Sequence, residues 1–316
     1  MAYLLLTSFK ASSTTVAASK MTSRKKLTVS ISTWFCLPEQ GMKDMEILSR
    51  ATAFIVKSSS SSYKNRLHVL TASHNVAPWK FPKMYPEEWL QFIDEKNTHY
   101  TIEVRHPDGI FMTQSELLPV SYHHSSRDLA VLHLEKDADG VSLFDHLGCD
   151  YFGLSIDQPE QGDSLLFEGH SIVAANGTSS SSNFDRGDEE VPTDGTGNAQ
   201  QDVRLPVPTI IPGTFVSQNM FQQYAQSVHQ INHGMSGGPV TFKKSGGAES
   251  RGNVKGTSRI RTAVSVPGTI STSTAAAVSS SNGDVCGLLE SVVPQDSKDV
   301  ALRGMVCYVD SLTIKE

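Results

Sequence analysis

Short apolar runs separated by polar, turn-rich segments dominate the central part of the chain. The run Ala53–Val56 is followed by the serine tract Ser58–Ser62 and then by a second apolar run, Leu67–Ala72. Short runs of apolar and β-branched residues bounded by turn-forming residues are typical of β-strands. The pattern therefore predicts two strands joined by a polar loop.

The same pattern recurs along the rest of the chain. It predicts further strands over Thr101–Arg105, Leu129–Leu134, Ser164–Phe167, Pro206–Val216, Val228–Phe242, Val285–Val293 and Gly304–Val309. The segment Pro86–Lys96 differs, because it has a proline at a possible first turn, early acidic residues, and Trp89, Phe92 and Ile93 at helical spacing. It is predicted to form one short helix. Many strands and few helices favour an all-β fold.

Two segments lack the apolar residues that a core needs. Asn176–Gln201 is rich in Ser, Gly, Asp and Glu, and Lys243–Asp284 is rich in Ser, Thr, Gly and Ala. Neither can bury enough apolar area to offset the entropy lost on ordering, so both are predicted to be disordered insertions.

The N-terminal segment has a composition of its own. Between Met1 and Pro38 there are five Lys and Arg residues, abundant Ser and Thr, and no acidic residue. Residues 1–40 are therefore predicted to be disordered, either as an organellar transit segment (mitochondrion or plastid) or as a tail on a cytoplasmic protein. Secretion is disfavoured, because the apolar run Tyr3–Leu6 is too short for a signal peptide.

Composition and charge exclude several classes of protein. The 316 residues are 38% apolar, which is enough for a sizeable core. No run of 18 apolar residues occurs, so no transmembrane helix is expected. The net charge is −6, whereas proteins that bind nucleic acid through its phosphates usually carry an excess of basic residues. The widely spaced Cys36, Cys149, Cys286 and Cys307 form no CxxC pair, which favours reduced, buried thiols over a disulfide framework or zinc site.

The strongest chemical signal is the glycine-rich run around Ser236, Gly234–Pro239 (GMSGGP). A serine hydroxyl is a poor nucleophile, and it needs a base for its proton and donors for the developing oxyanion. Glycines let the chain turn sharply, so the amides of Gly234 and Ser236 could point into one hole. The run also fits the G-x-S-x-G elbow of α/β-hydrolases, where the histidine follows the serine. Here all eleven histidines precede Ser236, which excludes that triad.

The base therefore has to come from upstream, and His74 is the best candidate. It follows the apolar run at the junction of a strand and a loop, where a side chain is held firmly and stays accessible. The other upstream histidines that we considered lie in a polar loop, inside strands, or on the turn of the serine itself: His123, His124, His68, His133 and His233. A third residue should orient the imidazole, and Asp128, which opens a predicted strand, is suited to that role. Taken alone, Asp128 would more often cap a strand.

The motifs TASH, RDLAVL and GMSGGP follow one another in the order His, Asp, Ser, and together they resemble those of the trypsin-like (chymotrypsin-fold) serine proteases. The closest likeness is to the HtrA/Deg branch. Ile231–Pro239 (INHGMSGGP) is similar to that branch's INPGNSGGP, and Asp128–Leu132 (DLAVL) to its DIALL. The resemblance extends over about Ile47 to Leu312, outside the two insertions.

The resemblance implies two six-stranded antiparallel β-barrels, the first over 45–160 with His74 and Asp128 and the second over 161–316 with Ser236. It also implies a serine endopeptidase that hydrolyses peptide bonds of protein or peptide substrates through an acyl-enzyme. Ser236 would be the nucleophile, His74 the base and Asp128 the residue that fixes its tautomer, while the amides of Gly234 and Ser236 would form the oxyanion hole. No metal or other cofactor is implied.

The chain departs from these relatives at several positions. Asn75 stands where secreted trypsins have a cysteine, Met235 where they have an aspartate that pairs with a new N-terminus, and His233 where the HtrA branch has a proline. Only seven residues follow Val309, so no PDZ domain is expected.

Two other interpretations stay open at this point. One is a catalytically silent binding or scaffold protein on the same fold. The other is a subtilisin-like order Asp, His, Ser, in which Asp44 would serve, although no motif surrounds it. The substrate and the oligomeric state do not follow from the sequence.

Overall fold

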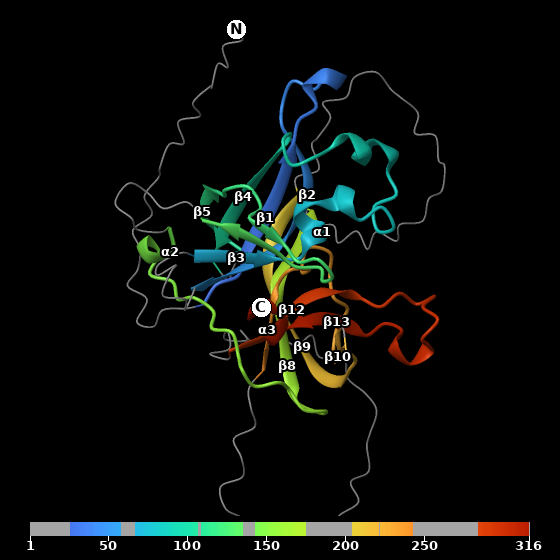
Figure 1. Cartoon of the computed structure of the whole chain (residues 1–316). Helices are drawn as coiled ribbons and strands as arrows, with labels where there is room; N and C mark the ends of the chain where they lie inside the picture. The colour runs from blue at the N-terminus through green and yellow to red at the C-terminus, as the bar shows by residue number, and fades with distance from the viewer. Residues whose placement is uncertain are drawn as a thin grey trace, which may run out of the picture.

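The structure is a computed structural model that describes residues 26–57, 67–106, 109–134, 143–174, 204–220, 222–242 and 284–315. The predictions for residues 1–25 and for the two insertions, apart from Asp284, lie outside the described residues. The described elements form two β-sheet units, which lie one above the other in Figure 1. The predicted all-β fold is confirmed.

The first unit is a seven-stranded antiparallel sheet. Its strands, in their order across the sheet, are β5 (Phe111–Glu116), β4 (Thr98–Arg105), β1 (Val29–Phe35), β2 (Glu46–Lys57), β3 (Leu67–Thr71), β7 (Ala130–His133) and β6 (Tyr122–His123). One isolated bridge, Leu117 to Leu134, links the segment after β5 to the residue after β7. The sheet therefore curls back on itself but differs from the closed six-stranded barrel expected here, because β6 and β7 are too short to form a continuous ladder with β5.

The N-terminal boundary of this unit also differs from the prediction. Strand β1 lies within residues 1–40, which we expected to be disordered, and it pairs with β2 on one side and β4 on the other. Val29 and Ile31 are buried in the core, as expected for a central strand. Ser30 and Ser32 are buried as well, so a pattern that counts serine as polar did not detect this strand.

The predicted helix over Pro86–Lys96 is a short 3₁₀ helix, η4 (Glu88–Phe92). Leu90 in this helix and Ile93 directly after it are buried, whereas Trp89 and Phe92 are 43% and 54% exposed. The helical spacing of Trp89 and Phe92 therefore does not correspond to a buried face. A 3₁₀ helix has three residues per turn, so Leu90 and Ile93 share one face.

The second unit is a closed six-stranded antiparallel barrel, as predicted. Its strands are β8 (Ser164–Ala174), β9 (Arg204–Gln218), β10 (Gln223–Ser227), β11 (Pro239–Phe242), β12 (Val285–Val292) and β13 (Val306–Asp310), in the order β10-β13-β12-β11-β8-β9 around the barrel. The predicted strand Val228–Phe242 is shorter than expected, because only its last four residues form β11. The residues before β11 form the turn that carries Ser236.

An apolar layer joins the two units. It combines Phe54 and Leu70 of the first sheet with Val285 and Leu288 of β12, and all four side chains are buried. Phe152, in the segment that connects the units, packs edge-on against Phe54. The two halves therefore share this apolar cluster, besides the separate core of each half.

The remaining elements are short. They are η1 (Pro38–Gln40), α1 (Ser73–Val76), η3 (Pro78–Lys80), α2 (Leu143–His146), η5 (Val300–Leu302) and α3 (Ser311–Lys315). None of the helices in the described residues is long and apolar enough to cross a membrane.

The four cysteines are free, as expected. Cys149, Cys286 and Cys307 are buried, while Cys36 is only half-buried. Burial raises the pKa of Cys149 to about 11, and it is also the main reason why the pKa of Cys286 and of Cys307 rises to about 12. The three buried thiols therefore stay protonated at neutral pH and act as small apolar groups.

Candidate active site

His74 lies on helix α1, immediately after strand β3 in the first sheet. The backbone N–H of His74 donates to Asp128 Oδ1 at 2.9 Å, and its ring Nδ1 is hydrogen-bonded to Asp128 Oδ2. Both side chains are buried, with 6% and 7% of their surface exposed. Because Asp128 accepts at Nδ1, the second ring nitrogen, Nε2, is left to accept a proton from another group.

Asp128 comes from the loop that precedes β7. The side chain of His124 holds this loop, because its Nδ1 accepts from the N–H groups of Ser126 and Arg127 at 3.2 and 3.1 Å. Ser73 Oγ donates to the Leu129 carbonyl at 2.8 Å, which ties the start of α1 to the same loop. Neighbouring hydrogen bonds thus fix both members of the pair.

Ser236 completes the group from the second unit. Its Oγ lies 3.0 Å from His74 Nε2, although the two residues are 162 positions apart in sequence. The same hydroxyl donates to the Glu290 carbonyl at 2.8 Å. The structure therefore brings together all three residues that the sequence singled out. Asp44, the alternative acid, lies exposed between η1 and β2.

The turn around Ser236 depends on two glycines with left-handed backbone conformations. The φ angles are +93° at Gly234 and +84° at Gly237. A Cβ on Gly237 would lie 2.3 Å from both the Thr52 carbonyl oxygen and Thr71 Oγ1. A Cβ on Gly234 would lie 2.7 Å from the His170 carbonyl oxygen. Both positions therefore require glycine for conformation and for space.

The four carbonyl groups from His233 to Ser236 all have hydrogen-bond donors. The His233 carbonyl accepts from the Ile172 N–H at 3.2 Å, and the Met235 carbonyl accepts from the Gly238 N–H at 3.1 Å. The N–H and C=O of a trans peptide point in opposite directions, so these contacts turn the amides of Gly234 and Ser236 the other way. Among the described residues neither amide has a hydrogen-bond acceptor. Two neighbouring donors are thus available for a ligand oxygen.

The comparisons with known proteins are distant. No protein-family model matches the sequence, and no curated protein is similar to it. Two of the solved structures to which it is similar are those of one protease. The active form of the Rv3671c protease from M. tuberculosis is 12% identical, with a TM-score of 0.43, over 92% of this chain and 78% of that chain. The inactive form is 11% identical, with a TM-score of 0.40, over 90% and 85%.

Met235 stands where secreted trypsins have an aspartate, and the structure shows what this position does here. The side chain is fully buried in the barrel core, packed with residues such as Leu165, Phe167 and Val240. The N–H of Met235 also donates to the Asn232 carbonyl at 3.2 Å. Apolar burial and a backbone bond therefore anchor the turn, with no ion pair at this position.

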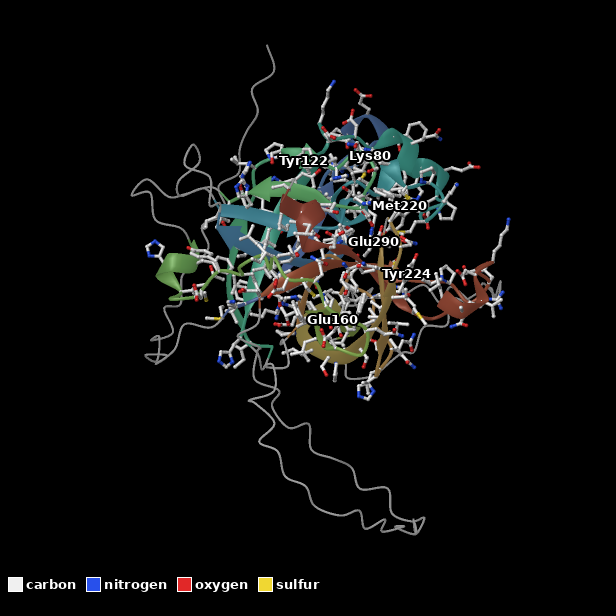
Figure 2. The ribbon with its side chains drawn as sticks, turned by 60° about the horizontal axis from the view of Figure 1, so that its bottom comes forward. Lys80, Tyr122, Glu160, Met220, Tyr224 and Glu290 are labelled. Carbon is white, nitrogen blue, oxygen red and sulfur yellow. The ribbon has the colours of Figure 1, made fainter. Side chains whose placement is uncertain are left out.

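A second carboxyl group, Glu290, lies beside the site and was not detected from the sequence. Its Oε2 accepts from Gln222 Nε2 at 2.5 Å. Burial raises the pKa of Glu290; the Gln222 bond lowers it and the negative charge of Asp128 raises it further. In Figure 2 Glu290 is near the centre of the face, with Met220 and Tyr224 beside it in this view. Its backbone carbonyl and its side chain therefore both border the site.

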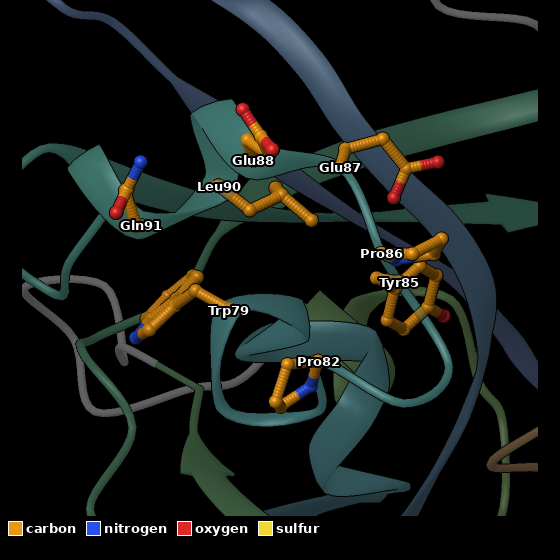
Figure 3. A pocket seen from close by; sticks show the side chains of 8 residues that line it. All are labelled: Trp79, Pro82, Tyr85, Pro86, Glu87, Glu88, Leu90 and Gln91. Carbon is orange, nitrogen blue, oxygen red and sulfur yellow. The ribbon is translucent and has the colours of Figure 1, made fainter.

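A pocket of about 430 Å³ lies in the segment after α1 (Figure 3). Most of its lining side chains are aromatic rings, prolines or aliphatic groups: Trp79, Pro82, Tyr85, Pro86, Glu87, Glu88, Leu90 and Gln91. Tyr85 connects the pocket to the site, since its ring centroid is 6.2 Å from that of His74. Burial, and then the charge of Asp128, raise the pKa of Tyr85 to about 12, so the phenol stays neutral.

In the part of the chain that the structure describes, no cluster of three or more His, Cys, Asp or Glu side chains could hold a metal ion. The residues described at the site are a serine hydroxyl beside an imidazole, with two backbone N–H groups nearby.

Proposed function

We propose that the protein is a serine endopeptidase that uses Ser236, His74 and Asp128. The observation that carries the proposal is the 3.0 Å contact between Ser236 Oγ and His74 Nε2, with the other ring nitrogen held by Asp128. This is the arrangement that a serine needs to lose its proton as it attacks a carbonyl carbon. Within this class, the INHGMSGGP and DLAVL motifs favour the HtrA/Deg branch.

In the proposed reaction, Ser236 Oγ attacks the carbonyl carbon of a peptide bond while His74 Nε2 takes the hydroxyl proton. The amides of Gly234 and Ser236 donate to the oxygen that becomes negative. His74 then protonates the leaving amine, which departs and leaves an acyl-enzyme. Water attacks this ester with His74 again as the base, and Ser236 regains its proton. Asp128 keeps the imidazole in the required tautomer and stabilises its cation.

The two free amides supply a large part of the expected rate enhancement. Removing one donor from a formed oxyanion hole typically lowers kcat by roughly 10²- to 10³-fold. Because both donors come from the backbone of one short turn, their placement depends on how that turn is held. The substrate is a protein or peptide segment that can enter as an extended chain.

One observation favours a different function, that of a catalytically silent binding protein. Ser236 Oγ is 2.8 Å from the Glu290 carbonyl and 3.0 Å from His74 Nε2, so two acceptors compete for a single hydroxyl hydrogen. If the hydrogen stayed on Glu290, His74 could not activate the serine. A partner protein would then bind to the same cleft without being cut.

Labelling with a fluorophosphonate probe separates the two functions. We expect the wild type to be labelled and Ser236→Ala to be inert, with equal circular dichroism spectra for both. Rates of peptide hydrolysis should fall by roughly 10⁴- to 10⁶-fold in Ser236→Ala and in His74→Ala, and hardly further in the double variant. A folded wild type that takes up no probe would overturn the protease proposal in favour of the silent one.

A further inference from the structure

Thr52, a fully buried residue of strand β2, contacts the serine turn at two points. Its N–H donates to the Ser236 carbonyl at 3.1 Å, and its Oγ1 donates to the Gly234 carbonyl at 2.6 Å. Thr52 belongs to the unit that carries His74, while Gly234 and Ser236 belong to the other unit. One residue of the first sheet thus touches both residues whose amides face the site.

The Thr52 hydroxyl has a fixed direction. Its oxygen accepts from the His170 N–H of strand β8 at 2.8 Å, so its own hydrogen is directed to the Gly234 carbonyl. The Thr52 carbonyl in turn accepts from Thr71 Oγ1 at 2.7 Å. Every polar group of Thr52 is therefore engaged, and the residue links β2, β3, β8 and the serine turn.

Gly234 is the residue in the turn that most needs such a restraint. A glycine has many accessible backbone conformations, and Gly234 has a φ of +93°. Rotation of the peptide group between His233 and Gly234 would carry the Gly234 N–H out of the site, and this rotation is limited when the next peptide group, between Gly234 and Met235, is also held. The preceding carbonyl, that of His233, is held by Ile172 of β8, and the Gly234 carbonyl itself is held by Thr52 of β2. Because the peptide groups before and after the Gly234 Cα are both held, the Gly234 N–H is restricted to one orientation.

The space around Thr52 allows little adjustment. A Cβ on Gly169 would lie 3.0 Å from Thr52 Oγ1, and a Cβ on Gly237 would lie 2.3 Å from the Thr52 carbonyl oxygen. Without the hydroxyl, the Gly234 carbonyl and the His170 N–H would each lose the partner recorded here. The turn would then be free to rotate so that these groups find other partners, because unpaired buried polar groups are strongly disfavoured.

From these contacts we infer that the Thr52 hydroxyl is a positioning group for the oxyanion hole, acting from the first sheet on the Gly234 amide in the second unit. The expected effect of the Thr52 hydroxyl on reaction rates rests on the proposed protease function. The structural part, that the Thr52 hydroxyl holds the turn, stands independently of that function. Thr52 itself does not touch the substrate; it holds the Gly234–Met235 peptide group, which is next to the His233–Gly234 peptide group that carries the Gly234 N–H.

The test uses the full chain with Thr52→Val, which keeps the shape and removes the hydroxyl, and Thr52→Ser, which restores it. Thr101→Val is the matched control: Thr101 is a buried threonine of β4 whose hydroxyl accepts from Trp34 Nε1 at 2.9 Å, away from the serine turn. Two readouts are needed. One is the fluorophosphonate labelling rate at several probe concentrations, which separates probe binding from the bond-forming step. The other is hydrogen exchange of the backbone amides over residues 230–240.

We expect Thr52→Val to slow the bond-forming step by about 10- to 100-fold, less than deletion of an oxyanion donor, with little change in probe binding. Thr52→Ser should recover most of this rate, and Thr101→Val should match the wild type. Exchange over 230–240 should be faster in Thr52→Val alone. Equal exchange and equal labelling in folded Thr52→Val and wild type would overturn the inference.

The design also separates the two proposals. If the wild type takes up no probe, the protease proposal fails, and the exchange measurement still decides whether Thr52 holds the turn. If the wild type is labelled, and Thr52→Val and Thr101→Val change the labelling rate and the amide exchange equally little, the role of Thr52 is wrong and the protease proposal stands.

Discussion

The two units hold their parts of the site in different ways. His74 and Asp128 both belong to the first unit and bind each other directly, so their geometry needs no help from the barrel. Ser236 sits on a turn of the barrel, yet its carbonyl accepts from Thr52 N–H and from Asn75 Nδ2, both in the first unit. The base is positioned within one unit, whereas the nucleophile is positioned by contact between units. Changes at the junction should therefore affect the nucleophile first.

Among substitutions that act on the contact between the units, the largest effect is expected from Gly237→Ala. The new Cβ would lie 2.3 Å from the Thr52 carbonyl oxygen and Thr71 Oγ1, so the turn and β2 must move apart. We expect fluorophosphonate labelling to fall by at least about 10³-fold, as in loss of the oxyanion donors, while the His74–Asp128 pair stays intact. The proton NMR resonance of the hydrogen between His74 Nδ1 and Asp128 would report whether that pair stays intact.

Gly148→Ala is the matched control for this substitution. Gly148 also has a positive φ, +63°, but nothing lies within 4 Å of the added Cβ. The Gly148→Ala substitution should lower the free energy of unfolding by about 1 kcal/mol through backbone strain and leave fluorophosphonate labelling unchanged. Normal labelling of Gly237→Ala would show that the junction does not control the nucleophile.

A smaller effect is expected from the barrel side, through Met235. Because this side chain is fully buried in the barrel core, Met235→Ala should lower the free energy of unfolding by about 2–5 kcal/mol. Met235→Leu conserves most of the volume and should cost less than about 1.5 kcal/mol. Urea unfolding of the three proteins measures these differences. Equal stabilities for Met235→Ala and the wild type would mean that the core does not anchor the turn.

The smallest effect concerns Glu290, whose carboxyl borders both units. Its pKa is raised in the folded protein, mainly by burial, so its charged form destabilises the fold. The contribution of Glu290 to the free energy of unfolding is therefore most favourable at a pH below the ordinary carboxyl pKa. It becomes less favourable as the pH rises through the raised pKa of Glu290. Glu290→Gln keeps a polar partner for Gln222 and has no charge, so it should be more stable than the wild type at neutral pH, by about 1.4 kcal/mol per unit of pKa difference.

Thermal unfolding of both proteins between pH 4 and 8 checks this prediction. The two stability curves should converge at the acidic end and separate at the neutral end. A constant difference across the range would show that the charge of Glu290 is not the cause.

The sequence was most informative where chemistry restricts the residue type. The glycines around Ser236, the histidine after an apolar strand and the aspartate before another all follow from what a serine nucleophile needs, and the structure places the three side chains together. Thr52 could not be found in this way. It stands at the edge of an apolar run, and its role appears only when β2 lies against a turn more than 180 residues away.

The fold shows the same division. Five of the six barrel strands were recognised because they are apolar and bounded by turns, whereas β10 was missed because its sequence, QYAQS, is largely polar. Strand β1 was not recognised, because its serines and threonines are buried between two neighbouring strands. One of these neighbours is β4, and even the pair of residues closest in sequence, Phe35 and Thr98, is 63 positions apart. The 3₁₀ helix η4 buries Leu90 and Ile93 because of its tighter period, which spacing at an α-helical repeat does not anticipate.

The position of β1 sets a limit on maturation of the chain. If a protease trims the N-terminal segment after import into an organelle, the cut has to fall before Val29. Loss of β1 would separate β4 and β5 from β2, and the strand that carries Thr52 would lose its neighbour on that side. For the same reason, a shortened form made for crystallisation should begin no later than Lys26, which forms a bridge with Asp150 at the start of the described chain.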